Sequence, residues 1–103
     1  MQYFTKQPSE QYAISVEFYL VLQSGISLVS GTVSAIDISN NNSDATSIVL
    51  DSATVTINAT KASIFVKAGV DGHTYKISMV ITTTGSTPVS IFEEDLFMEV
   101  KAL

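Results

Sequence analysis

The chain contains no cysteine, no tryptophan and no arginine, and only two of its 103 residues are proline. Without cysteine, a disulfide framework, a thiolate metal site and a cysteine nucleophile are all excluded. Without arginine, the chain lacks the planar guanidinium that binds a phosphate or carboxylate through two parallel hydrogen bonds. The net charge of -5 at pH 7 further disfavours nucleic acid and anionic membranes, because both require clustered basic residues.

The sequence also lacks a long hydrophobic run. Its longest apolar stretch, residues 18–22, is far shorter than the roughly 20 residues that a membrane-spanning helix requires. The segment from Met1 to Lys6 does not place a basic region before an apolar one, so no secretory signal is expected. We therefore expect a protein made in a cytoplasm. We also expect one domain, residues 1–103, that is large enough to bury a core without disulfide bonds or a structural metal.

Alternation of apolar and polar residues with a period of two is the main pattern present. Ile14, Val16 and Phe18 fall on one face of an extended segment, and Ser15 and Glu17 fall on the other, which predicts a strand with one buried face. A second alternating segment begins at residue 75, and no segment has helical periodicity. We expect strands over residues 14–20, 31–38, 46–50, 54–58, 62–68, 75–82 and 89–101.

Seven or more short strands separated by turn signals are typical of a sandwich. The turn signals include an Asn-rich loop at residues 39–44 and a Gly-Ser-Thr-Pro turn at residues 85–88. The predicted fold class is all-β, a single Ig-like or fibronectin-III-like antiparallel β-sandwich. Gly72 in a tight turn and Tyr75 at the start of a long strand match the tyrosine corner, in which a phenol hydrogen-bonds the backbone a few residues upstream.

Groups that could carry chemistry are few. His73 is the single histidine, and no second histidine or cysteine can join it around a metal, so we interpret it as a solvated turn residue. No Gly-x-Ser-x-Gly motif is present, and a histidine without a positioned partner does not make a triad. The sequence thus predicts no catalytic residue, no cofactor, no metal site and no small-molecule substrate.

Two polar clusters have ordinary structural explanations. Glu93, Glu94 and Asp95 are adjacent, and adjacent residues of a strand point to opposite faces, so these carboxylates cannot jointly flank one bond. We interpret them as a solvated edge, with a bulge or break where the alternation slips. The loop from Asn40 to Asp44 lacks the spaced acidic pattern of a calcium loop and is interpreted as a plain loop.

The N-terminal segment, residues 1–12, is predicted to be either a docking arm or an edge segment, because Pro8 cannot donate to a sheet ladder. Its aromatic residues either contact a partner or cover one end of the sandwich. The candidate contact residues are Tyr3, Phe4, Lys6, Pro8 and Tyr12.

With these residues in place, the chain resembles a family of small Ig-like virion proteins of tailed bacteriophages, which act as fibre–tail adaptors or capsid decoration proteins. The strongest match is Gly69-x-x-Gly72-x-x-Tyr75-Lys76-Ile77. The chain departs from the family at two points, since it lacks the family's tryptophan near the first strand and its arginine after Gly85. The other matching segments are residues 6–10, 14–18, 22–27, 80–85 and 96–100.

The resemblance implies a non-enzymatic virion component that is assembled in the bacterial host cytoplasm, is present in several copies and binds other virion proteins. The leading interpretation is an adaptor that joins a fibre or neighbouring ring to the tail or neck. The nearest alternative is a capsid decoration protein. A carbohydrate-binding or adhesin module is a third, disfavoured because sugars usually stack on exposed aromatics and the chain has no tryptophan.

Overall fold

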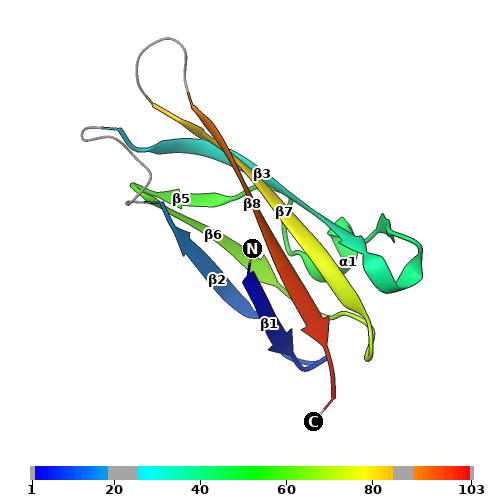
Figure 1. The fold of residues 1–103 in the computed structure, drawn as a ribbon. Coiled ribbons are helices and arrows are strands. Elements are labelled where there is room, and N and C mark those ends of the chain that lie inside the picture. Colours follow the sequence, from blue (N-terminus) through cyan, green and yellow to red (C-terminus); the bar gives the residue numbers. More distant parts are fainter. Residues whose placement is uncertain (1, 19–25, 85–89, 103) are drawn as a thin grey trace.

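The computed structural model of the protein describes residues 2–18, 26–84 and 90–102. Two β-sheets lie face to face in this part of the chain (Figure 1), which confirms the all-β sandwich. The elements are β1 Gln2–Lys6, β2 Tyr12–Glu17, β3 Leu28–Asp37, a 3-10 turn η2 Ile38–Asn40, β4 Ser43–Asp44, α1 Thr46–Val49, β5 Thr56–Asn58, β6 Lys61–Val66, β7 Thr74–Thr83 and β8 Ile91–Val100.

One sheet has the strand order β1-β8-β7-β3-β4, and the other has the order β2-β6-β5. Every neighbouring pair is antiparallel except β1 and β8, which run parallel with Tyr3 opposite Phe97. The expectation of a wholly antiparallel sandwich was therefore wrong at this edge. The segment between β1 and β2 carries the chain from one sheet to the other, so the two N-terminal strands belong to different layers.

The core lies between the inner faces of the two sheets. The predicted apolar face of β7 is confirmed, since its four alternate side chains are at most 1% exposed. Burying an aliphatic or aromatic side chain of this size contributes roughly 1.5–3 kcal/mol. The flanking core residues of the same sheet come from β3 and β8, and the facing ones come from β6. The core members that are at most 1% exposed are Ala35, Ala45, Val49, Ala62, Val66, Tyr75, Ile77, Met79, Ile81, Leu96, Met98 and Val100.

The strand expected at residues 46–50 was wrong, because residues 46–49 form the one-turn helix α1. The Asp44 carboxylate accepts hydrogen bonds from the Thr46 backbone N (3.1 Å) and hydroxyl (2.8 Å). The Val49 N–H then donates to the Ala45 carbonyl at 3.0 Å. This turn places Val49 fully inside the core, so a local hydrogen-bond network overrides the strand preference of β-branched residues.

The bulge expected near residues 93–95 was also wrong. Strands β7 and β8 pair without interruption from Thr74 opposite Glu99 to Thr82 opposite Ile91. The apparent slip arises because Glu94 is a half-buried acid on the face of β8 that carries Leu96. The turn expected at residues 85–88 lies outside the described residues, as do residues 19–25.

The remaining strands are confirmed with shifted bounds. The strand expected at 31–38 begins earlier, and an irregularity between Leu28 and Ser30 separates its first residue from the rest of the ladder. The strands expected at 54–58 and 62–68 are shorter. Asn41 and Asn42 have φ angles of 55° and 56°, the left-handed conformation that asparagine tolerates.

Two glycines in the turn before β7 should differ in their tolerance of alanine. Both have positive φ, but a Cβ on Gly69 would meet Val100 Cγ2 at 2.7 Å, whereas one on Gly72 would meet nothing within 4 Å. Gly72→Ala should cost about 1–2 kcal/mol of unfolding free energy from backbone strain alone. Gly69→Ala should cost about 1–3 kcal/mol more because of the overpacking. Urea denaturation measures both, and equal losses would contradict this account.

Hydrogen bonds from Thr46 hold the pKa of Asp44 below its usual value of 3.8. A carboxyl whose folded pKa is lowered adds stability above its unfolded pKa, and that stability is lost as pH falls through the folded pKa. Asp44→Asn should therefore lose less stability than the wild type between about pH 6 and about pH 2.5. The urea midpoint measured across this range tests the prediction, and parallel curves for the two proteins would refute it.

Candidate docking surface

The N-terminal segment contributes the edge strand β1, in which alternate side chains point to opposite faces. Tyr3 points outward and is 73% exposed, while Phe4 packs against the core. Lys6, on the same face as Phe4, is fully buried. The structure therefore separates the sequence-predicted contact residues, and of the three in β1, Tyr3 alone is exposed on the sheet surface.

Lys6 has a structural role at the crossing between the sheets. Its Nζ donates to the carbonyl of Gln7 at 2.6 Å and to that of Pro8 at 3.3 Å. Burial lowers the pKa of the Lys6 ammonium from its usual value, and the charge of Glu10 partly opposes this shift. Since its ammonium is occupied inside the domain, Lys6 is removed from the set of contact residues.

Tyr12 and Pro8 lie near this crossing. Tyr12 is partly buried and packs against the core, where burial, with a smaller contribution from Glu10, raises the pKa of its phenol. Pro8 is half-buried in the turn before β2. The position of Tyr12 therefore fits a residue that covers one end of the sandwich better than one that contacts a partner.

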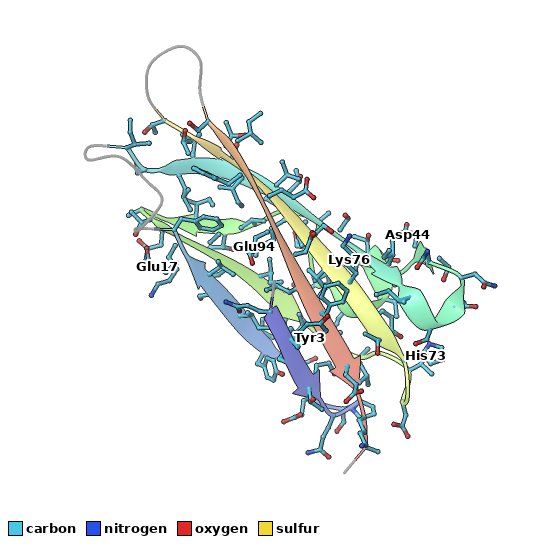
Figure 2. All side chains as sticks on the ribbon, viewed as in Figure 1. Tyr3, Glu17, Asp44, His73, Lys76 and Glu94 are labelled. Atoms are coloured by element: carbon cyan, nitrogen blue, oxygen red, sulfur yellow. The ribbon has the colours of Figure 1, made fainter. Side chains whose placement is uncertain are left out.

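The outer face of the five-stranded sheet brings Tyr3 next to residues that are distant in the sequence (Figure 2). The rings of Tyr3 and Phe97 stack with centroids 4.9 Å apart and an interplanar angle of 17°. In the next row of the same face, Thr5 is opposite Glu99, and Glu99 is opposite Thr74. Strands β1, β8 and β7 thus each supply one side chain to this row.

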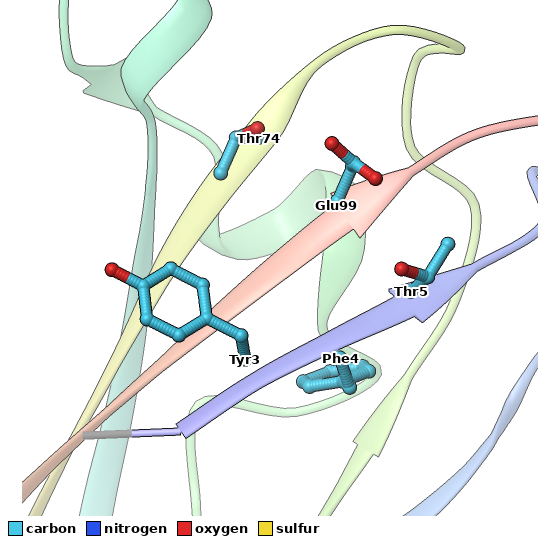
Figure 3. A pocket seen from close by; sticks show the side chains of 5 residues that line it. All are labelled: Tyr3, Phe4, Thr5, Thr74 and Glu99. Carbon is cyan, nitrogen blue, oxygen red and sulfur yellow. The ribbon is translucent and has the colours of Figure 1, made fainter.

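These two rows border a shallow hollow of about 250 Å³, open to solvent. Figure 3 shows the Tyr3 ring, the Glu99 carboxylate and the Thr74 and Thr5 hydroxyls on one side of the sheet, with the Phe4 ring on the other. We define the Tyr3 hollow as the concavity lined by Tyr3, Phe4, Thr5, Thr74 and Glu99.

Elsewhere on the outer face, apolar and acidic side chains alternate. Ile91 is 65% exposed and Val80 is 38% exposed, and Glu93 lies opposite Val80. Asp95 has an ion-pair distance of 3.8 Å to Lys76. This part of the face therefore combines exposed apolar groups with acidic ones.

Sequence reasoning identified Tyr3 but missed Phe97, Glu99 and Thr74. The contact of Tyr3 with β8 depends on parallel pairing between the two ends of the described chain, and Thr74 joins through the antiparallel pairing of β7 with β8. No local pattern encodes this combination. One signal was present: Phe97 and Glu99 occupy the positions between Leu96, Met98 and Val100, so they had to face outward if those three faced the core.

His73 lies in the turn before β7, as expected, with a side chain that is 30% exposed, but it also makes a structural contact. Its Nδ1 lies 2.7 Å from Oδ2 of Asp37, whose side chain is 8% exposed. The other Asp37 oxygen accepts from the Ser39 N–H at 3.1 Å, and the Ser39 hydroxyl accepts from the Thr74 N–H at 3.0 Å. These bonds join the end of β3 to the start of β7, next to the 3-10 turn.

The chain turns into β7 through the Gly72–Tyr75 segment. The Tyr75 hydroxyl, on a side chain that is 1% exposed, accepts a hydrogen bond from the Val70 N–H at 2.9 Å, five residues upstream. The Gly72 N–H donates to the Val100 carbonyl at 2.8 Å. This is the hydrogen-bond geometry of a tyrosine corner, and it ties the turn to the end of β8.

Within residues 2–18, 26–84 and 90–102, no group of three or more His, Asp or Glu side chains is arranged to hold a metal ion. The same residues include no helix long and apolar enough to cross a membrane.

Tyr75→Phe should reduce the unfolding free energy by about 1–2 kcal/mol, because the Val70 N–H loses its acceptor in a partly buried position. Tyr12→Phe is the matched control. Tyr12 is partly buried, and among the described residues its hydroxyl has no hydrogen-bond partner. Removing this hydroxyl should therefore change the unfolding free energy by less than about 0.5 kcal/mol. Thermal or urea unfolding of both variants measures the difference, and similar values would argue against the corner's contribution.

Comparison with known proteins places the chain in one family. The model of the family described as podophage GP4 fiber-tail adaptor protein gp77 matches residues 6–91. No curated protein and no solved structure matches the chain. The match begins at the last residue of β1 and ends at the first residue of β8, so it covers β2 to β7 and leaves out most of β1 and β8. The chain therefore belongs to the podophage GP4 fibre-tail adaptor family of bacteriophage structural proteins.

Proposed function

We propose that this protein is a non-enzymatic adaptor of the phage particle that joins a fibre or a neighbouring ring to the tail or neck. The family match over residues 6–91 carries this proposal. The adaptor binds other virion proteins rather than small molecules, and it is present in several copies around the tail axis.

The outer face of the five-stranded sheet supplies a surface suited to this task. Tyr3 is 73% exposed yet fixed in place by its stack on Phe97. A side chain held by a hydrogen-bonded strand loses little conformational freedom on docking, so more of its contact energy remains available for binding. Aromatic residues of this kind commonly dominate binding energy at protein interfaces.

The site chemistry supports a binding role rather than catalysis. The single histidine is engaged with Asp37 at 2.7 Å, where it joins β3 to the turn before β7. An imidazole held by a carboxylate through Nδ1 acts as a general base only where its Nε2 also reaches a nucleophile or substrate in a concave site. The hollow on the outer face is lined by one carboxylate, three hydroxyl-bearing side chains and no histidine.

The capsid decoration role is the nearest alternative, and copy number separates the two. Mass spectrometry of purified particles should count about six to twelve copies of this chain, as closed rings at a single vertex require. Near-parity with the major shell protein would instead assign it to capsid decoration. Complete absence from particles would refute the virion role altogether.

A further inference from the structure

We propose that the Tyr3 hollow receives an arginine side chain of the partner protein, with the guanidinium held between the Tyr3 ring and the Glu99 carboxylate. This inference rests on the proposed adaptor function, since a partner virion protein supplies the arginine. It assigns a chemical specificity to one defined place on the outer face.

The sheet register sets the spacing of the two groups. Tyr3 is opposite Phe97 and Thr5 is opposite Glu99, so Tyr3 and Glu99 are diagonal neighbours on one face. With neighbouring strands about 4.8 Å apart and a rise of about 3.3 Å per residue in a parallel pair, such neighbours start roughly 8 Å apart. A planar cation placed between them lies within the approximately 6 Å that a cation–π contact allows while its edge meets the carboxylate. Figure 3 shows both groups on the same side of β1 and β8.

The charge of the hollow is negative and uncompensated. Asp95 has Lys76 at 3.8 Å, but the structure gives Glu99 no cationic partner among the described residues. Glu99 is exposed, and the hydroxyls of Thr5 and Thr74 flank it in the same row. An incoming cation would therefore find one carboxylate and two further oxygen acceptors without breaking an existing ion pair.

Arginine fits this arrangement better than the other cations. Its guanidinium stacks on an aromatic face and forms two parallel hydrogen bonds to a carboxylate, whereas lysine offers a compact, strongly hydrated point charge. A calcium ion would need six or more oxygen ligands, and the hollow has a single carboxylate.

The occupant must come from a different protein. This sequence contains five lysines and no arginine, so a second copy of the chain has no guanidinium to insert. The net charge of -5 also opposes face-to-face pairing of two such acidic surfaces. Both observations point to a basic segment of another virion protein.

The specificity can be tested with the isolated chain by titrating the ¹⁵N-labelled protein with N-acetyl-arginine amide and, separately, N-acetyl-lysine amide. Arginine should shift the amide signals of Tyr3, Thr5, Thr74 and Glu99, and bind at least about threefold more tightly than lysine. Glu99→Gln and Tyr3→Leu should each weaken arginine binding by about tenfold, whereas Tyr3→Phe should retain it. Equal shifts with lysine, or none at these residues, would overturn the proposal.

Glu93→Gln is the matched control, because Glu93 lies on the same face of β8 but does not line the Tyr3 hollow. It removes the same charge and should leave arginine binding unchanged. Both glutamates are exposed, so both variants should fold with thermal midpoints within about 2 °C of the wild type. Equal loss of binding in the two variants would indicate general charge attraction and refute the specific site.

Particle assembly separates this inference from the function on which it rests. In infections where plasmid-encoded variants replace the phage's own copy, Glu99→Gln should enter particles about tenfold less efficiently than Glu93→Gln. If the wild-type chain enters particles and Glu99→Gln enters equally well, the arginine site is refuted and the virion role stands. If the wild-type chain is absent from particles, the proposed function fails first.

Discussion

Complete burial of alternate side chains along β7 is the constraint on which the other elements depend. From Tyr75 to Ile81 these side chains are at most 1% exposed, and β7 is hydrogen-bonded to β3 on one side and β8 on the other. A strand in this position must be covered by a second sheet, which β2, β6 and β5 provide. It also fixes which side chains of β8 face outward, because the register between the two strands is continuous.

That register links the core to the candidate docking surface. Once Met98 is placed opposite Tyr75, Phe97 and Glu99 are directed to the outer face. The parallel pairing of β1 then sets Tyr3 beside Phe97. The exposed aromatic stack and the hollow next to it thus lie on the outer face of the five-stranded sheet. The inner face of the same sheet forms part of the core. The residues of the proposed binding site and those of the core thus alternate along one strand.

Much of the fold was predictable from sequence because alternation is a local signal. The strands around Val16 and Met79 were found for that reason. The helix at residues 46–49 was missed because one turn shows no periodicity, and it depends on hydrogen bonds that Asp44 makes to Thr46. The regular pairing of β8 was missed because Glu94 interrupts the apolar pattern without interrupting the ladder. The docking surface was only partly predictable, since Tyr3 is visible in the sequence but its pairing partners lie at the far end of the described chain.

The parallel pairing of β1 with β8 has a consequence for synthesis on the ribosome. Tyr3 emerges early, but Phe97 is among the last described residues to be made, so the edge strand has to wait for almost the whole domain before it can add to its sheet. Closing so long a loop slows folding more than it weakens the folded state. The stacked pair therefore exists only in a finished domain. A nascent or truncated copy that lacks β8 therefore also lacks this surface.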